Sequence, residues 1–262
     1  MNIEGKNVLI TGGGGGIGAA LARRFRDEGA RAIAIVDRDL DAAQAVATEL
    51  APRIKSLAYQ VDVGDAGQVQ AMVERAEDEA GPLDLVCSNA GVFPRGDSLT
   101  GDSNWSLSWT VNVMGNVHVA RAVVPRMLQR GHGYILITCS AAGLLGNMDA
   151  PYMATKHAAV AFAEWLAIQY RTKGIGVSAL CPLGVMTPML TEVANGNPAA
   201  IQGVLAGGEV ISPEALAECV VQGIAGERFL ILPHPVVAER VMKKAADRDR
   251  WIAAMQQQFA IT

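Results

Sequence analysis

Five consecutive glycines at residues 12–16 constrain this chain more than any other feature of its sequence. They follow the apolar run 7–11 and precede the 3.6-residue periodicity of residues 17–28, which predicts a strand, a tight turn and a helix. Glycine has no Cβ, so a ligand can approach the main chain closely. The amides and the dipole of a helix N-terminus attract phosphate groups. The turn therefore predicts a site for the pyrophosphate of a dinucleotide.

The glycine run fits two known fingerprints for such a turn. One is G-x-G-x-x-G, on Gly13, Gly15 and Gly18. The other is T-G-x-x-x-G-x-G, on Thr11, Gly12, Gly16 and Gly18. The run alone does not choose between them.

Asp37 closes the second apolar run, about 20 residues after the turn. A carboxylate there can accept hydrogen bonds from the adenosine ribose hydroxyls and would repel a 2′-phosphate, so it favours NAD over NADP. Two alternatives stay open. Neighbouring Arg38 can compensate the charge and admit NADP, or Asp37 can simply cap the following helix.

Short β-branched runs alternate with longer segments of helical periodicity along the chain. The strand candidates are residues 7–11, 31–36, 54–61, 83–88, 134–138, 175–181 and 229–232. The helical segments include residues 17–28, 40–50, 67–79 and 105–129. This alternation predicts an α/β fold, with a Rossmann-like, doubly wound parallel sheet of about seven strands in three α/β/α layers. We expect one domain over residues 1–262, with a substrate lid around 186–211 where the pattern becomes irregular.

Composition argues against several other classes of protein. Half of the residues are apolar and 18% are charged, which supplies a core for both faces of a sheet. The net charge is −4 and no basic run occurs, so we expect neither nucleic acid nor a membrane surface as a partner. The four histidines have no metal-ligand spacing, and we expect Cys87, Cys139, Cys181 and Cys219 to be small buried hydrophobic residues. With no bilayer-length apolar stretch and no leader pattern, we expect a cytoplasmic protein.

Tyr152 and Lys156 lie four residues apart at the start of a helical pattern, so both project from one face of the helix. Tyrosine is ordinarily a poor base at neutral pH, but a nearby ammonium group stabilises its phenolate form. Ser140 follows the strand 134–138, where its hydroxyl can hydrogen-bond a substrate oxygen that changes charge. Both features also have a purely structural interpretation. The tyrosine and the lysine can be ordinary surface residues, and the serine can hydrogen-bond the backbone of its own turn. Thr138, on the same side of the strand as Ser140, is an alternative hydroxyl.

Several of these motifs occur together in one order. They are the glycine turn, Asp37, Asn89-Ala90-Gly91, Asn112, Ser140 and the Tyr152–Lys156 pair. In order and spacing over nearly the whole chain, the set resembles the short-chain dehydrogenase/reductase family in its single-domain form. Within that resemblance, the glycine fingerprint anchored on Thr11 is favoured.

The resemblance implies an oxidoreductase that transfers a hydride between NAD(H) and an alcohol or ketone. Tyr152 would be the general acid/base, and Lys156 would stabilise its phenolate and bind the nicotinamide ribose. Ser140 would orient the substrate oxygen, and Asn112 would hold a water that links Lys156 to solvent. The resemblance also implies these cofactor-binding residues: Gly12, Gly16, Ile17, Gly18, Asp37, Asp62, Val63, Asn89, Tyr152, Lys156, Val185 and Thr187. The scattered histidines give no support for a metal site.

Two departures from the family pattern affect details of the site. Ser140 and Tyr152 are separated by 11 residues, where the family more often has one more. Leu183 follows Pro182 where glycine is usual. Neither change removes a catalytic group, but the shape of the loop 143–150 and the cofactor contacts at Leu183 are the least transferable details.

The residues expected around the substrate are mostly apolar. They are Phe93, Leu144, Leu145, Met148, Met186, Met189 and Leu190. This set favours a hydrophobic alcohol or ketone, although the same side chains can simply pack the lid onto the body. The alternative functions are an NADP-linked carbonyl reductase and a non-catalytic, dinucleotide-binding regulatory protein.

The helical segment 151–171 is apolar almost all round, with Phe162, Trp165 and Ile168 beyond the stripe that one sheet face needs. A second apolar face predicts contact with another subunit. The resemblance implies a homotetramer more than a homodimer. Apolar residues near the C-terminus can likewise pack on a neighbouring subunit or cover the pocket. They are Val237, Val241, Ala245, Ile252, Met255 and Phe259.

Overall fold

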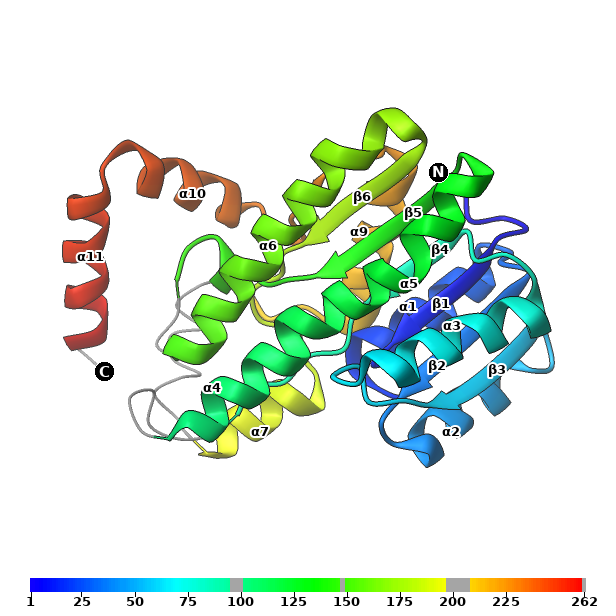
Figure 1. The fold of residues 1–262 in the computed structure, drawn as a ribbon. Helices are drawn as coiled ribbons and strands as arrows, with labels where there is room; N and C mark the ends of the chain where they lie inside the picture. Colours follow the sequence, from blue (N-terminus) through cyan, green and yellow to red (C-terminus); the bar gives the residue numbers. More distant parts are fainter. Residues whose placement is uncertain (95–100, 147–148, 197–207, 261–262) are drawn as a thin grey trace.

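The computed structural model describes residues 1–94, 101–146, 149–196 and 208–260, except for the side chains of 193–196 and 258–260 (Figure 1). Its centre is a sheet of seven parallel strands in the order β3-β2-β1-β4-β5-β6-β7. The strands are β1 (Asn7–Thr11), β2 (Ala32–Asp37), β3 (Lys55–Gln60), β4 (Leu85–Ser88), β5 (Gly133–Thr138), β6 (Ile175–Leu180) and β7 (Leu230–Ile231). The strand order reverses between β1 and β4, and ligands bind outside the carboxyl ends of strands at such a point.

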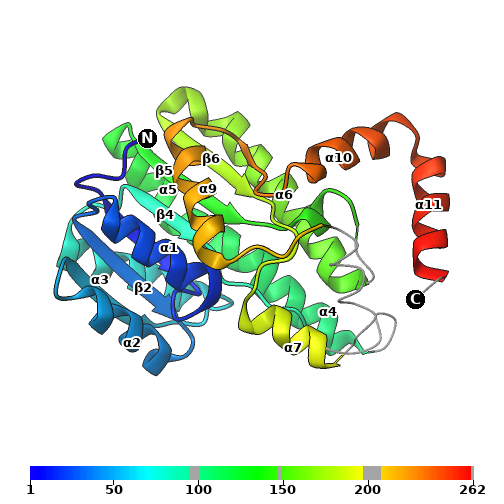
Figure 2. The same ribbon diagram turned by 180° about the vertical axis from the view of Figure 1, so that it is seen from behind.

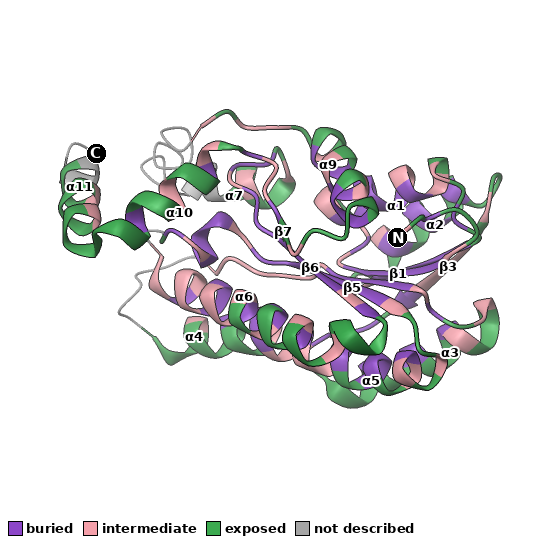
Figure 3. Cartoon of the chain, turned by 90° about the horizontal axis from the view of Figure 1, so that it is seen from above, coloured by how far each residue is buried: buried purple, intermediate pink, exposed green. Residues whose placement is uncertain are grey.

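Helices cover both faces of the sheet (Figures 1 and 3). One face carries α1 (Gly16–Asp27), α2 (Leu40–Leu50) and α9 (Pro213–Ala225). The opposite face carries α3 (Ala66–Ala80), α5 (Gly115–Arg130) and α6 (Ala150–Tyr170), which ends in a 3₁₀ turn (Arg171–Lys173). All five residues of β1 are buried, as expected for a parallel strand covered on both sides. The doubly wound, Rossmann-like α/β fold expected from the sequence is confirmed.

The segment 105–129 differs from the single helix that its periodicity predicts. It divides into α4 (Asp102–Trp109), a π-helical turn (Thr110–Met114) and α5. In the turn, the carbonyl of Asn112 accepts a hydrogen bond from the side-chain amide of Asn116 at 2.6 Å. The π-helical turn is only five residues long, and a periodicity taken over the whole segment averages across it, so the sequence pattern does not reveal it.

The expected lid begins with α7 (Pro188–Gly196), and residues 197–207 lie outside the described part of the chain. A parallel bridge between Val185 and Ile211 joins the two ends of this insertion. The insertion therefore leaves the body and returns to it at one place, beside the end of β6.

Two C-terminal helices form an arm, α10 (Val236–Ala246) and α11 (Arg248–Ala260), which extends from the three-layer body (Figures 1 and 2). Val237 is fully buried against Ala141 and Leu145, in and beside the 3₁₀ turn Ala141–Gly143 that follows β5. The buried ammonium of Lys244 donates to the carbonyl oxygen of Leu144 at 2.6 Å. Desolvation lowers the pKa of Lys244. These contacts fasten the arm to the segment that carries Ser140.

Across the described residues, no helix combines the length and the apolar character needed to cross a membrane. The same residues contain no group of three or more His, Cys, Asp or Glu side chains placed to hold a metal ion. The cysteines are free thiols. Cys87, Cys139 and Cys181 are buried as expected, whereas Cys219 is only half-buried.

Candidate active site

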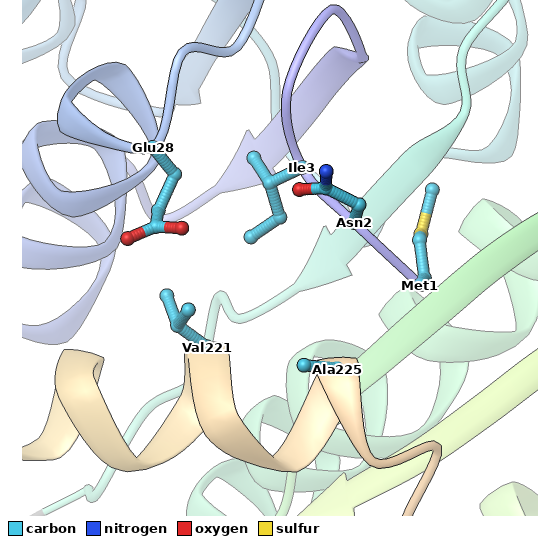
Figure 4. Close-up of a pocket in the computed structure, with 6 residues that line it drawn as sticks. All are labelled: Met1, Asn2, Ile3, Glu28, Val221 and Ala225. Atoms are coloured by element: carbon cyan, nitrogen blue, oxygen red, sulfur yellow. The ribbon is translucent and has the colours of Figure 1, made fainter.

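A cavity of about 550 Å³ opens at the carboxyl ends of the strands. Its walls include residues that end or follow each of β1 to β6. A second cavity of about 240 Å³ lies between the N-terminal segment and α9 (Figure 4), lined by Met1, Asn2, Ile3, Glu28, Val221 and Ala225. This smaller cavity contains none of the expected site residues, so the larger cavity is the candidate active site.

The glycine turn adopts a backbone conformation that most other residues disfavour. Gly12 and Gly16 have positive φ angles of 62° and 49°. A Cβ on Gly18 would collide with the carbonyl oxygen of Gly12, so this glycine lets α1 pack against the turn. A Cβ on Gly15 would meet nothing within 4 Å. The geometric demands therefore favour the fingerprint anchored on Thr11 over the one that requires Gly15.

Thr11 and Asn89 join the glycine turn to the end of β4. The Thr11 hydroxyl oxygen accepts from the backbone amides of Asn89, at 3.0 Å, and Ala90, at 3.1 Å. In return, the Asn89 side-chain amide donates to the carbonyls of Thr11 and Gly12 at 3.1 and 3.2 Å. The position of the turn is thus set by side-chain hydrogen bonds across the point where the strand order reverses.

Asp37 lines the cavity at the end of β2 and faces the glycine turn. One carboxylate oxygen accepts from the amide of Gly14 at 3.0 Å, and the other accepts from the amide of Asp39 at 3.2 Å. The cap of α2 is Asp39, whose side chain accepts from Ala42. The alternative that Asp37 caps this helix is therefore wrong. Arg38 also lines the cavity.

Asp62 and Val63 line the cavity just beyond β3, as expected. The Asp62 carboxylate accepts from the amide of Gly64 at 2.8 Å, and the carbonyl of Val63 is 2.9 Å from Nδ1 of His118.

Ile17, Val185 and Thr187 line the cavity near the glycine turn. A Cβ on Gly16 would lie 3.2 Å from the Thr187 methyl group, so the chain that enters α7 lies against the turn. At the start of α7, the Thr187 hydroxyl accepts a hydrogen bond from the amide of Leu190 at 3.3 Å.

Tyr152 and Lys156 stand together at the start of α6. Asp149 caps this helix and accepts from the amide of Tyr152 at 2.7 Å. The Lys156 ammonium is buried, lies 5.6 Å from the centre of the Tyr152 ring and donates to the carbonyl of Thr138 at 3.1 Å. The Phe93 ring packs against the Tyr152 ring at a centroid distance of 4.6 Å. The structure therefore brings the expected tyrosine and lysine to one wall of the cavity.

Ser140 lines the same part of the cavity. Its hydroxyl oxygen accepts from the amide of Ala142 at 3.1 Å, so Ser140 does hydrogen-bond the backbone of the turn that follows it. That bond leaves the hydroxyl hydrogen available for a ligand. Thr138 also lines the cavity, and its buried hydroxyl has no hydrogen-bond partner among the described residues.

Asn112 fastens the segment after β4 to α6. Its side chain accepts from the amide of Val92 at 2.9 Å and donates to the carbonyl of Val92 at 3.0 Å. It also donates to the hydroxyl of Thr155 at 3.2 Å. Both amide hydrogens of Asn112 are thus in use. The geometry shows a positioning contact, and the expected water-holding role stays a prediction.

Only some of the residues expected around the substrate line the cavity. Phe93, Leu145, Met189 and Leu190 line it, and Met148 lies outside the described residues. Leu144 and Met186 are wrong as lining residues, because Leu144 packs under α10 and Met186 is 60% exposed.

The C-terminal arm supplies three further lining residues, Arg240, Trp251 and Met255. Of these, the apolar C-terminal pattern contains only Met255. No local signal marks Arg240 or Trp251, because their place depends on how the arm folds over the body.

The described residues fit a nicotinamide dinucleotide. The glycine turn exposes main-chain amides at the start of α1, where phosphate is favoured. The cavity runs from the carboxylates of Asp37 and Asp62 to Ser140 and Lys156. An elongated ligand with polar groups along its length suits this lining.

Comparison with known proteins gives a consistent result. Residues 6–198 match the family described as short chain dehydrogenase. The chain is 35% identical over 243 residues to 1-deoxy-11-beta-hydroxypentalenate dehydrogenase of Streptomyces exfoliatus, an alignment that covers 88% of this chain and 84% of the relative.

Two solved structures show the same fold. A short-chain dehydrogenase/reductase from Burkholderia phymatum in complex with NAD has a TM-score of 0.84 and 29% identity, with coverage of 95% of this chain and 96% of that one. A gluconate 5-dehydrogenase from Burkholderia cenocepacia in complex with NADP and tartrate has a TM-score of 0.78 and 28% identity, with coverage of 87% and 92%. With its doubly wound fold and the tyrosine–lysine pair beside the glycine turn, the chain belongs to the short-chain dehydrogenase/reductase family of oxidoreductases.

Proposed function

We propose that this protein is a dehydrogenase or reductase that transfers a hydride between NAD(H) and a hydrophobic alcohol or ketone. The observation that carries the proposal is that one cavity contains the glycine turn, Ser140, Tyr152 and Lys156. The glycine turn suits a dinucleotide pyrophosphate, and the other three side chains suit a proton transfer at an oxygen atom.

The roles follow from the contacts of these side chains. A nicotinamide bound in the cavity would donate or accept the hydride. The Tyr152 hydroxyl exchanges a proton with the substrate oxygen, and the buried Lys156 ammonium, 5.6 Å from the phenol ring, stabilises the phenolate. The Ser140 hydroxyl, which already accepts from Ala142, donates its hydrogen to the same substrate oxygen.

A preference for NAD over NADP rests on Asp37. Its carboxylate lines the cavity beside the glycine turn, where a negative charge disfavours a 2′-phosphate. Arg38 also lines the cavity, which supports an NADP-linked carbonyl reductase as the second candidate. Of the two structural relatives, one is named as an NAD complex and the other as an NADP complex, so the choice depends on these two side chains.

A hydrophobic substrate is supported by the apolar side chains that line the cavity. They include Phe93, Leu107, Val111, Leu145, Met189, Leu190, Trp251 and Met255. The Streptomyces relative is named as a dehydrogenase of a hydroxy compound. We further propose that the protein works in the cytoplasm as a homo-oligomer, with the exposed apolar face of α6 as a contact surface.

A substrate screen tests the proposal. Secondary alcohols of increasing apolar size are offered with NAD and, separately, with NADP, and the absorbance of the reduced nicotinamide is followed. We expect turnover to be faster with NAD and to improve with apolar size. Turnover faster with NADP would favour the second candidate. Absence of oxidation with every alcohol, and of reduction with the matching ketones, would contradict both.

A further inference from the structure

His234 is a buried histidine outside the catalytic set, in the turn between β7 and α10. Its Nδ1 accepts from the backbone amide of Leu183 at 3.2 Å, and its Nε2 lies 3.1 Å from the carbonyl oxygen of Glu209. A carbonyl oxygen can only accept, so Nε2 carries the proton while Nδ1 is bare. The two contacts therefore require the neutral imidazole in one tautomer.

These two contacts join opposite ends of the lid insertion. Leu183 precedes the insertion, and Glu209 lies on the returning chain. Beside them, Ile211 donates to the carbonyl of Gly184 at 3.1 Å, and Met186 donates to the carbonyl of Ile211 at 2.9 Å. The imidazole completes a closed set of hydrogen bonds at the base of the lid.

The segment held in this way is a wall of the active site. Pro182, Leu183, Gly184, Val185 and Thr187 all line the cavity. The carbonyl of Pro182 also accepts from the amide of Ala141 at 2.8 Å, which links the wall to the turn after Ser140. Main-chain hydrogen bonds thus connect the imidazole to the wall of the cavity and to the turn after Ser140.

We infer that His234 is a positioning residue whose neutral imidazole holds the wall 182–187 in its cofactor-binding arrangement, and that protonation of the ring releases this wall. The inference rests on the proposed dinucleotide site. In the imidazolium form, Nδ1 carries a hydrogen that opposes the Leu183 amide, so the first of the two contacts is lost.

The charges around the ring set the direction of this effect. Burial lowers the pKa of His234 below the ordinary value of 6.5, and hydrogen bonds to Glu209 and Gly184 and the charge of Glu209 act in the opposite direction. The segment 182–185 brings only backbone polar groups to the ring, and the adjoining residues 235–237 have no titratable side chain. Because the folded-state pKa is lowered, the native arrangement is fully stable above about pH 6.5 and loses stability as the pH falls below it.

The test compares the wild-type protein with His234→Gln, which keeps an acceptor and a donor but cannot gain a proton in this range. The Kd for NADH is measured by fluorescence at about pH 7.5 and about pH 5.5, on either side of the ordinary histidine pKa. We expect the wild-type Kd to rise by about twofold or more at the lower pH, where part of the ring is protonated, while the Kd of the variant stays nearly constant. His132→Gln, at an exposed histidine, is the matched control and should behave like the wild type.

Hydrogen exchange provides a second readout that does not depend on ligand binding or activity. After correction for intrinsic rates, protection of the backbone amides of residues 183–187 should fall as the pH falls in the wild type and stay constant in His234→Gln. Equal pH dependence in the wild type and His234→Gln, in both measurements, would overturn the inference and leave the proposed function intact. Absence of dinucleotide binding in the wild type at both pH values would overturn the proposed function, and the inference with it.

Discussion

At the scale of single residues, the site depends on backbone positions that tolerate no side chain. Gly12 and Gly16 occupy the left-handed region, and Gly18 faces the carbonyl oxygen of Gly12. By contrast, Gly15 has open space around it although it belongs to the same run. Five glycines that look equivalent in the sequence therefore have different physical roles in the fold.

This difference predicts different costs for two alanine substitutions. Gly18→Ala should lower the free energy of unfolding by about 2 kcal/mol and weaken dinucleotide binding by about tenfold, because the new methyl group displaces the turn. Gly15→Ala should cost less than about 1 kcal/mol, the usual range for replacing a glycine N-cap. Chemical denaturation and NADH titration measure both effects. Equal costs for the two variants would show that the turn adapts to a side chain at residue 18.

At the scale of elements, α6 presents the tyrosine and the lysine on one face because its first turn is fixed. Asp149 caps the helix through the amide of Tyr152, and Pro151 occupies the first turn. Burial raises the pKa of Asp149, while the hydrogen bond from Tyr152 lowers it. The ionised cap is therefore a compromise between a strong acceptor and the cost of burying a charge.

Two substitutions of the cap separate these contributions. Asp149→Ala should lower the free energy of unfolding by about 1 kcal/mol, whereas Asp149→Asn keeps an acceptor and should stay within about 0.5 kcal/mol. The pKa of Asp149 is raised in the folded state. The free energy of unfolding of the wild-type protein therefore falls as the pH rises above 3.8, the ordinary pKa of this carboxyl group. Denaturation between about pH 4 and pH 7 should show the asparagine variant gaining relative to the wild type. An asparagine variant that is as unstable as the alanine variant at every pH would contradict this account.

Most elements could be predicted from the sequence because their periodicity is strong. The strands lie within two residues of the expected ranges, and Asn89, Ser140, Tyr152 and Lys156 all line one cavity. The π-helical turn could not be predicted, since it is only five residues long and a periodicity taken over the whole segment averages across it.

Trp251 and Arg240 were missed for a different reason. Their place in the cavity depends on the tertiary path of the C-terminal arm, which no local pattern encodes.

At the scale of the whole molecule, the outer face of α6 carries large apolar side chains away from the core. Trp165 is 48% exposed and Ile168 is 69% exposed, and the rings of Phe162 and Tyr170 pack against Trp165. Large exposed apolar side chains gathered on one helix face are typical of a surface that another subunit covers.

If this patch is a subunit contact, a charge placed in it should disrupt assembly. Ile168→Lys should lower the sedimentation coefficient of the wild-type oligomer toward that of a monomer. Met242→Lys is the control, since Met242 is 74% exposed on α10, away from the patch. A wild-type protein that sediments as a monomer at every concentration, or an equal effect of the control, would contradict the oligomer proposal.

The central claim is that Tyr152 transfers the proton that accompanies hydride transfer, and Tyr152→Phe tests it most directly. The measurement is single-turnover reduction of NAD with an alcohol identified by the screen, together with the Kd for NADH. Tyr170→Phe, at the far end of the same helix, is the matched control. The account predicts that Tyr152→Phe binds NADH within about threefold of the wild type and is slower by a factor of about 10² or more, while the control is unchanged. A Tyr152→Phe variant that turns over at the wild-type rate would contradict it.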